Sequence, residues 1–311
     1  MSILLSGRFE ADERDRWLAA LREQLPGETL VVRGESEFDG DVDIAVVADA
    51  SARALLGLPR LRFVQSLWAG VERLLRDGGV PEGVVLARMV DPAMNEAMAQ
   101  TALWTVLGLH RDFFLYARQQ QQRLWVPHPQ RRADEVRVAV LGLGQMGAAA
   151  ARRLAQAGYP VIGWSARHRE VAGVRCLSGD AALAEVLAQA QIVINLLPLT
   201  PATAGLLNAR TLAQLPRGAA VVNLARGGHL VEADLLAALD RGHVAHAVLD
   251  VFASEPLPRE HPFWSHPQVT VLPHVAAATD VRSAATVVAR QVQAFRAGRP
   301  VEHVVDRQRG Y

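Results

Sequence analysis

The fold is decided by Val138-Ala139-Val140-Leu141-Gly142-Leu143-Gly144-Gln145-Met146-Gly147, where Gly-x-Gly-x-x-Gly directly follows an apolar run and precedes the helical pattern Ala148 to Gln156. Gly142 permits a tight turn, Gly144 lets the backbone approach a pyrophosphate, and Gly147 lets the helix pack close to the strand. The N-terminus of that helix faces the phosphates. The stretch therefore predicts a dinucleotide site, and the alternative is an ordinary glycine turn in an α/β sheet.

Apolar runs of strand length alternate with helical patterns on both sides of this motif. In the second part of the chain, the predicted strands are Val136–Leu141, Val161–Trp164, Ile192–Leu196, Ala220–Leu224, Ala247–Val251 and Val269–Leu272. In the first part, they are Ile3–Ser6, Thr29–Val32, Ile44–Val47, Leu61–Leu67 and Val84–Met89. Strands that alternate with helices favour parallel sheets with helical crossovers. We therefore predict an α/β protein with a doubly wound Rossmann-type sheet and a smaller α/β unit.

The connections between these parts indicate two domains. A long helix is predicted from Ala93 to Arg118, and the prolines within Trp125–Pro129 mark a connection after it. The last helix, Val281 to Ala297, is expected to fold back with its tail onto the first part. We predict a substrate domain from residues 1–97 and 281–311, and a dinucleotide-binding domain from residues 98–280.

The end of the second Rossmann strand indicates which dinucleotide binds. An NAD site usually has an acid there that accepts hydrogen bonds from the ribose. This strand instead ends Gly163-Trp164-Ser165-Ala166-Arg167-His168-Arg169. A hydroxyl and two guanidinium groups suit a 2′-phosphate. NADPH is thus the preferred cofactor and NADH a possible one, the alternative being a solvated basic turn.

Three segments place polar side chains after strands of the second domain, at the edge where open α/β sheets bind ligands. Arg226, Glu255 and His274 provide a cation, a carboxylate and an imidazole. This set suits reduction of a 2-oxo acid, because Arg226 holds the anion and polarises its carbonyl, His274 donates a proton, and Glu255 stabilises the imidazolium. Each residue has an ordinary alternative: a helix cap or domain bridge, a turn acid, and a buried histidine.

Composition excludes other classes of function. Lysine is absent, so all 33 residues of the Lys+Arg count are arginine, which excludes Walker A loops and Schiff-base enzymes. The single cysteine, Cys176, excludes multi-cysteine metal sites and indicates a reducing, cytoplasmic location. The histidines lack metal-ligand spacing, so no metal is expected. A net charge of +1 argues against nucleic acid, and no apolar stretch is long enough to predict a membrane span.

The order of the motifs resembles the D-isomer-specific 2-hydroxyacid dehydrogenases over nearly the whole chain. After the glycine motif come Asn223–Gly227, then Leu249–Leu257 with the pattern Leu-Asp-Val-Phe-x-x-Glu-Pro-Leu, then Pro273–Ala276. Within the family, Ile194–Pro198 and the ending Val305–Tyr311 are most similar to a bacterial group of glyoxylate and hydroxypyruvate reductases.

The resemblance implies NADPH-dependent reduction of glyoxylate to glycolate and of hydroxypyruvate to D-glycerate, with a flavodoxin-like substrate domain. It implies a homodimer, with Trp125 near the partner. Substrate would also contact the loop of Trp68, Ala69 and Gly70, where the family often has glycine instead of Trp68. The cofactor residues expected are Gly142, Gly144, Gln145, Met146, Gly147, Ser165, Arg167, Arg169, Leu197, Pro198 and Asp250. The remaining alternatives are a dehydrogenase for a bulkier 2-oxo acid and a dinucleotide-sensing regulatory protein.

Overall fold

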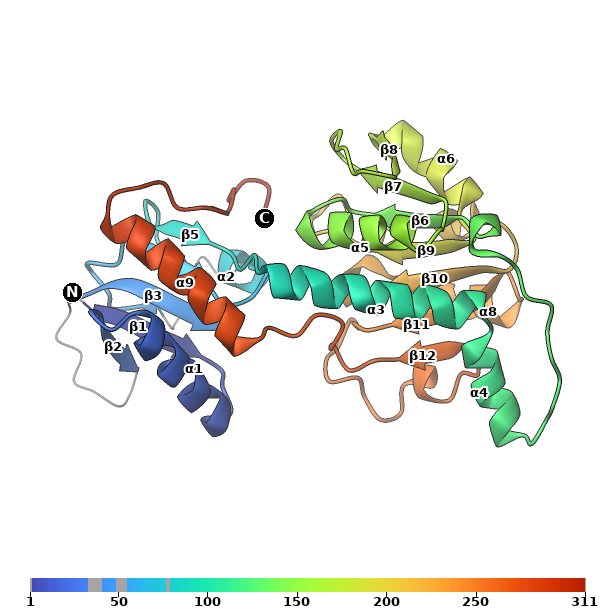
Figure 1. Ribbon diagram of the computed structural model, residues 1–311, viewed down its shortest axis with the longest axis horizontal. Coiled ribbons are helices and arrows are strands. Elements are labelled where there is room, and N and C mark those ends of the chain that lie inside the picture. Colours follow the sequence, from blue (N-terminus) through green and yellow to red (C-terminus); the bar gives the residue numbers. More distant parts are fainter. Residues whose placement is uncertain (1, 33–40, 49–54, 77–78, 311) are drawn as a thin grey trace. The chain divides into compact units, whose positions relative to one another are not determined.

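The computed structural model describes residues 2–32, 41–48, 55–76 and 79–310. The chain forms two compact units (Figure 1). The first unit combines Met1–Ala93 with Thr279–Tyr311, and the second unit is Met94–Ala278.

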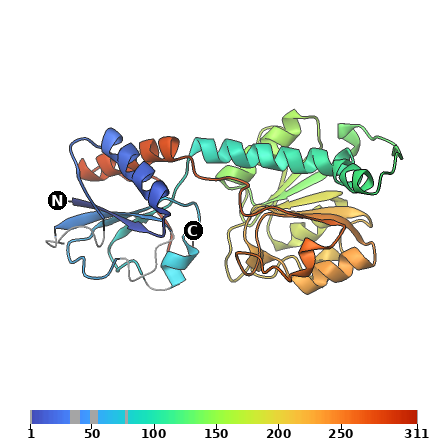
Figure 2. The ribbon, with the colours of Figure 1, turned by 90° about the horizontal axis from the view of Figure 1, so that it is seen from below.

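The first unit is built on a parallel sheet with the strand order β2-β1-β3-β4-β5 among the described residues. This is the flavodoxin-like order, so the α/β prediction for the first part of the chain is confirmed. Helices α1 and α9 lie side by side on one face of the sheet, and α2 lies on the other (Figure 2). The elements are β1 (Ser2–Gly7), α1 (Ala11–Gln24), β2 (Thr29–Val32), β3 (Val42–Ala48), β4 (Phe63–Ser66), α2 (Glu72–Arg76), β5 (Val85–Ala87) and α9 (Val281–Arg296).

The C-terminal segment is part of the first unit. Arg296 of α9 forms ion pairs with Glu28, at 2.8 Å, and with Asp43, whose side chain is buried. Beyond the helix, the Val305 N–H donates to the Leu86 carbonyl at 2.8 Å, which extends the sheet past β5. This segment therefore packs on a sheet formed by residues more than two hundred positions earlier.

The second unit contains a parallel sheet with the order β12-β11-β10-β9-β6-β7-β8 in the part of the chain that the structure describes. Read from β6, its first strand, this is the Rossmann order with one further strand, so the predicted Rossmann-type sheet is confirmed. The strands are β6 (Val138–Leu141), β7 (Val161–Ser165), β8 (Arg175–Ser178), β9 (Ile192–Asn195), β10 (Ala219–Asn223), β11 (Val244–Leu249) and β12 (Val269–Val271). The helices are α3 (Pro92–His110), α4 (Phe113–Gln121), α5 (Gln145–Gln156), α6 (Asp180–Gln189), α7 (Ala209–Leu212) and α8 (Glu232–Asp240).

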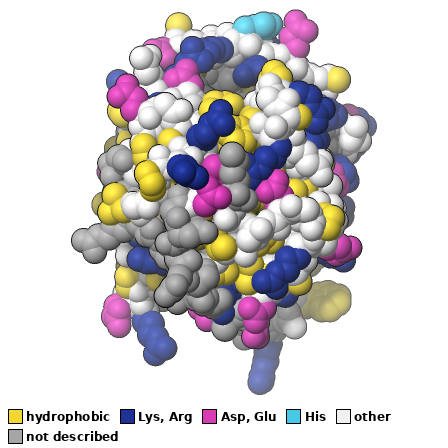
Figure 3. All heavy atoms as spheres, turned by 90° about the vertical axis from the view of Figure 1, so that its left-hand side faces the viewer, with side chains coloured by type: hydrophobic (Ala, Val, Ile, Leu, Met, Phe, Trp, Pro, Cys, Tyr) yellow, Lys and Arg dark blue, Asp and Glu magenta, His cyan; other side chains and the backbone are white. Residues whose placement is uncertain are grey.

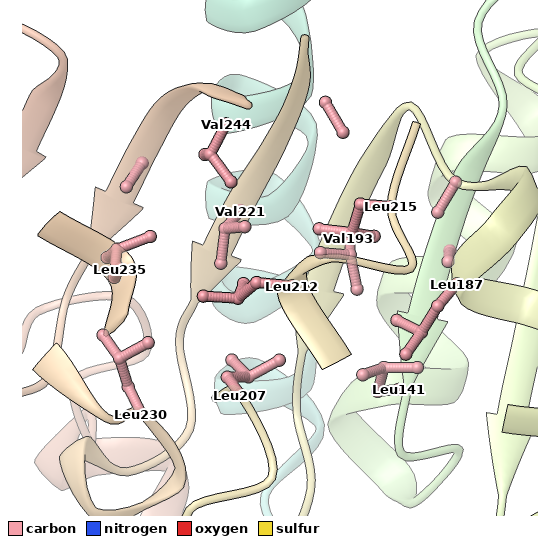
Figure 4. Close-up of a cluster of buried hydrophobic side chains, with 14 of the residues drawn as sticks. Leu141, Leu187, Val193, Leu207, Leu212, Leu215, Val221, Leu230, Leu235 and Val244 are labelled. Atoms are coloured by element: carbon pink, nitrogen blue, oxygen red, sulfur yellow. The ribbon is translucent and has the colours of Figure 1, made fainter. Parts of the chain in front are cut away.

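Both faces of this sheet are buried, which is why its strands are continuous apolar runs. Alternate residues of one strand point to opposite faces. Val138 and Val140 pack against α3 and α5, whereas Ala139 and Leu141 pack on the side of α6, α7 and α8. Figure 4 shows the second of these clusters, in which side chains from the strands meet those of the covering segments. The core thus fixes the strands and leaves their ends to carry polar residues.

Two details differ from the sequence prediction. The helix predicted over Ala93–Arg118 is two helices, α3 and α4, separated by Arg111 and Asp112. Asp112 has a φ of 59°, and a left-handed residue of this kind, which aspartate tolerates, ends one helix before the next begins. Strand β8 was not predicted, because Arg175–Ser178 is only partly buried and lacks a run of apolar residues.

The surface agrees with the interspersed charges of the sequence. On the face shown in Figure 3, arginine side chains lie among aspartate and glutamate side chains. No helix within the described residues is both long and apolar enough to cross a membrane.

Candidate active site

The glycine motif forms a close turn between β6 and α5. Gly142 has a φ of 97°, and a Cβ built on it would lie 2.6 Å from the Leu196 carbonyl oxygen. A Cβ on Gly147 would lie 1.7 Å from the Gly142 carbonyl oxygen. Gly144 differs, because a Cβ there would meet nothing within 4 Å. Two glycines are therefore required by packing, and the third faces open space at the start of a 12-residue helix, as a pyrophosphate site requires.

The turn after β7 carries the residues predicted to select NADPH. The Ser165 hydroxyl donates to the Arg167 carbonyl at 2.6 Å, so it shapes this turn and keeps its oxygen as an acceptor. Arg167 and Arg169 are exposed, and no partner for either guanidinium is found among the described residues. The two cations are thus available to an anion at the carboxyl edge of the sheet.

A histidine and a carboxylate meet at the same edge. His274, in the loop after β12, places Nδ1 2.8 Å from Oε2 of Glu255. The other carboxylate oxygen of Glu255 accepts the Phe252 N–H at 2.9 Å. His274 has a φ of 55° and its own N–H donates to the Asp250 carbonyl at 2.9 Å. About half of the imidazole surface is exposed, so the ring is oriented on one side and accessible on the other.

Asp250 holds the loop that carries His274. Its carboxylate accepts the N–H groups of Val275 at 2.7 Å and Ala276 at 3.0 Å. Only 1% of this residue is exposed. Burial raises the pKa of Asp250, while the two N–H donors act in the opposite direction. The predicted contact of Asp250 with a cofactor is therefore accompanied here by a structural role.

Arg226 lies in the loop after β10, close to the segment that leads to Glu255. A Cβ on the next residue, Gly227, would lie 1.9 Å from the carbonyl carbon of Phe252, so only glycine lets the two backbones touch. The Arg226 guanidinium donates to the Ala225 carbonyl at 2.6 Å. The loops of Arg226, Glu255 and His274 are thus linked to one another at one edge of the second unit.

A buried polar network beneath Arg226 was missed by sequence reasoning. Asn195 donates to the side chain of Asn223 at 3.0 Å, and Asn223 donates to the Arg226 carbonyl at 3.0 Å. The ring of His229 is fully buried, with Nδ1 3.0 Å from the Arg226 carbonyl oxygen and Nε2 3.2 Å from that of Pro198. The network connects the Arg226 loop to the predicted cofactor loop at Leu197 and Pro198. Only the asparagines at strand ends hinted at it in the sequence.

The other predicted cofactor residues lie at the same edge. Gln145 is exposed and Met146 half-buried at the start of α5. The Leu197 N–H donates to the Asn195 side chain at 3.2 Å, and the Pro198 carbonyl accepts the Thr203 hydroxyl at 2.7 Å. The loop of Leu197 and Pro198 is consequently held by the side chains of Asn195 before it and Thr203 after it.

The predicted substrate loop belongs to the first unit. Trp68 is 42% exposed, its N–H donates to the Ser66 hydroxyl at 3.1 Å, and its carbonyl accepts the Met89 N–H at 3.1 Å. Ala69 and Gly70 are half-buried, and their N–H groups have no acceptor within the described part of the chain. In the second unit, Trp125 is 97% exposed.

Comparisons with known proteins identify relatives of this chain. Residues 103–276 match the family described as D-isomer specific 2-hydroxyacid dehydrogenase, NAD binding domain. The chain is 40% identical over 306 residues to glyoxylate/hydroxypyruvate reductase A of Yersinia enterocolitica, covering 96% of this chain and 97% of the relative.

Solved structures are similar over the whole length. The D-isomer specific 2-hydroxyacid dehydrogenase of Xanthobacter autotrophicus Py2, in complex with NADPH and MES, has a TM-score of 0.94 and 40% identity, covering 100% of this chain and 99% of that one. The NADPH-dependent glyoxylate/hydroxypyruvate reductase of Sinorhizobium meliloti, in complex with NADP and sulfate, has a TM-score of 0.93 and 36% identity, and each chain is covered completely. The chain belongs to the D-isomer specific 2-hydroxyacid dehydrogenase family.

Proposed function

We propose that this protein reduces small 2-oxo acids with NADPH, converting glyoxylate to glycolate and hydroxypyruvate to D-glycerate. The observation that carries the proposal is the His274–Glu255 pair at the carboxyl edge of a Rossmann sheet, with the Arg226 loop packed beside it. Relatives that share about 40% of its residues bear the name glyoxylate/hydroxypyruvate reductase A, which supports this substrate class.

The two predicted domains have separate roles in this proposal. Residues 98–280 bind the dinucleotide, and residues 1–97 with 281–311 form the substrate domain. Gly144 leaves room for the pyrophosphate, and Arg167 and Arg169 pair with the 2′-phosphate, because two guanidinium forks stabilise a dianion that a carboxylate would repel. NADH lacks that phosphate and is expected to bind more weakly. The full set proposed to contact the cofactor is Gly142, Gly144, Gln145, Met146, Gly147, Ser165, Arg167, Arg169, Leu197, Pro198 and Asp250.

The chemistry divides between the cofactor and three side chains. Bound NADPH supplies the hydride that the carbonyl carbon of the 2-oxo acid accepts. Arg226 binds the anionic substrate and polarises its carbonyl, so negative charge developing on the oxygen is stabilised. His274 gives that oxygen a proton from Nε2, since Nδ1 faces Glu255. The carbonyl thus becomes a hydroxyl, and Glu255 stabilises the imidazolium before transfer.

The first unit supplies the proposed substrate loop. Ala69 and Gly70 carry N–H groups suited to a carboxylate, and the Trp68 ring limits the space for the rest of the acid. A large side chain at this position favours small substrates over bulky ones.

We also propose that the protein is a cytoplasmic homodimer. In the second unit, α3, α4 and the segment after them expose apolar side chains that a partner of the same kind would cover. These are Trp104, Leu107, Phe113, Leu124, Trp125 and Val126. Trp125→Ala should weaken dimerisation or raise the KM of the 2-oxo acid, as measured by sedimentation and steady-state kinetics.

The function is tested by following NADPH and NADH absorbance with glyoxylate, hydroxypyruvate, pyruvate and a longer 2-oxo acid. Fast oxidation of NADPH by the two small acids is the expected result. Turnover of the longer acid alone would identify a dehydrogenase for bulkier substrates. NADPH binding without turnover of any acid would favour a dinucleotide-sensing regulatory protein.

A further inference from the structure

Arg88 stands where β5 ends in the first unit, at the carboxyl edge of that parallel sheet. Its N–H donates to the His303 carbonyl at 3.2 Å. The N–H of the next residue, Met89, donates to the Trp68 carbonyl at 3.1 Å. Arg88 is therefore attached on one side to the C-terminal segment and on the other to the loop of Trp68, Ala69 and Gly70. Ligands of open α/β sheets bind at this edge.

Arg88 is half-buried, and none of the described residues forms an ion pair with it. Within the described part of the chain, its guanidinium makes no hydrogen bond, ion pair or cation–π contact. Burial lowers the pKa of Arg88, and no acid in the described part of the chain offsets this effect. The same unit pairs Arg296 with both Glu28 and Asp43. Removing a charge from water costs free energy unless the charge is paired. An anion that binds from outside the chain would supply the missing partner of Arg88.

The charged groups around Arg88 do not supply that anion. His303 feels the charge of Arg88, because its pKa is lowered first by burial and next by the positive charge of Arg88. Glu302 acts on His303 in the opposite direction, but its carboxylate pairs with Arg290 at 3.1 Å. This end of the sheet consequently carries positive charge that the described residues do not neutralise.

We propose that Arg88 binds the carboxylate of the 2-oxo acid, together with the N–H groups of Ala69 and Gly70. This rests on the proposed function. A guanidinium offers two parallel donors that match the two oxygens of a carboxylate, and the loop adds N–H groups without acceptors of their own. Glyoxylate has no anionic group other than its carboxylate, so a residue that serves every substrate of the enzyme recognises that group.

The test compares Arg88→Gln with wild type in steady-state reduction of glyoxylate and in calorimetric binding of oxalate to the NADP-bound enzyme. The KM of glyoxylate and the dissociation constant of oxalate should both rise about 10- to 100-fold, as expected for loss of a charge-assisted pair. NADPH affinity should remain unchanged. Arg88→Lys keeps the charge and loses the fork, so it should give a smaller rise in both constants.

Arg60→Gln is the matched control, because Arg60 is an exposed arginine of the same unit, paired with Asp41. It should leave both constants unchanged. An active wild type with unchanged constants in Arg88→Gln would overturn the role of Arg88 alone, whereas a wild type that neither reduces glyoxylate nor binds oxalate overturns the proposed function as well. Loss confined to 2-oxo acids with a second anionic group would also overturn the assignment, since Arg88 would then bind the far end of a larger acid. If Arg88→Gln fails to fold, unchanged constants in Arg88→Lys would overturn it.

Discussion

Glu255 fixes one nitrogen of the His274 ring. Oε2 lies 2.8 Å from Nδ1, and Oε1 is itself held by the Phe252 N–H at 2.9 Å. Because an ionised carboxylate only accepts hydrogen bonds, Nδ1 carries the proton in this pair and Nε2 is the nitrogen proposed to face the substrate. The left-handed backbone of His274, with a φ of 55°, is stabilised by its bond to the Asp250 carbonyl.

This pairing predicts distinct losses for the two partners. His274→Ala should lower kcat by roughly 100- to 10,000-fold, because a positioned proton donor contributes that much. Glu255→Gln keeps a hydrogen-bonding group but removes the charge that stabilises the imidazolium, and should lower kcat at least about 10-fold. Both variants should bind NADPH normally by fluorescence titration. A His274→Ala enzyme with the wild-type rate would exclude His274 as the donor.

A substitution at Gly144 tests the proposed cofactor contact without disturbing the packing of the fold. An added Cβ meets nothing within 4 Å, and the φ of −68° suits any residue, so Gly144→Ala should fold with wild-type stability in urea. It should weaken NADPH binding about 10-fold or more, since the methyl group occupies the space proposed for the pyrophosphate. The contrasting variant is Gly147→Ala, whose Cβ would lie 1.7 Å from a backbone oxygen and should destabilise the second unit. Unchanged NADPH affinity in Gly144→Ala would argue against the pyrophosphate site.

The two arginines after β7 give a test of cofactor preference. Replacing Arg167 and Arg169 together by alanine should weaken NADPH about 10- to 100-fold and leave NADH little changed, because only NADPH has the phosphate they are proposed to bind. Dissociation constants for both cofactors, measured by fluorescence, decide this. An equal loss for the two cofactors would remove the 2′-phosphate assignment.

The fold was predictable because each strand is a short apolar run between helical patterns. Both faces of the Rossmann sheet are buried, so Val138–Leu141 and Val221 with its neighbours are apolar without interruption. The glycine motif and the residues at strand ends were predictable for a related reason: parallel strands bring their carboxyl ends to one edge.

The features that the sequence did not predict depend on contacts between distant segments or on the local backbone. Nothing in the sequence distinguishes His229 from the other histidines. Its partners are backbone carbonyls, which every residue type has, so no sequence pattern indicates them. Arg88 gives no signal in the sequence either, since a lone arginine after a strand is ordinarily solvated, and only the three-dimensional structure shows that no described acid pairs with it. The break between α3 and α4 results from the left-handed backbone conformation of Asp112, which the helical spacing of apolar residues does not predict.

His229 contacts the Arg226 carbonyl through Nδ1 and the Pro198 carbonyl through Nε2, and two substitutions should remove one contact each. Asn places its amide nitrogen near the position of Nδ1, so His229→Asn should keep the Arg226 contact and lose the Pro198 contact. Gln reaches the position of Nε2 and should do the reverse. We expect His229→Asn to raise the dissociation constant of NADPH more, and His229→Gln to raise the KM of the 2-oxo acid more, each about 3- to 10-fold. Equal effects in the two variants would indicate that the residue only stabilises the fold.

His246 predicts how stability changes with pH. Its buried ring stacks on Phe114 and bonds to Thr270, and burial, followed by the charges of Arg118 and His266, lowers its pKa from 6.5 to about 4. Between pH 6.5 and about pH 4, His246 is therefore protonated in the unfolded chain and neutral in the folded protein. The free energy of unfolding consequently falls as the pH falls through this window. Above this pH window, the contribution of His246 to the free energy of unfolding is constant.

At about pH 5, this shift corresponds to a loss of roughly 2 kcal/mol relative to pH 7. Urea unfolding of wild type and His246→Gln at the two pH values measures it, and the pH-dependent part should be smaller in the variant by about that amount. His168→Gln is the control, because that side chain is exposed and should leave the pH dependence unchanged. If wild type and His246→Gln lose equal stability between pH 7 and pH 5, the buried ring does not govern the acid sensitivity of the second unit.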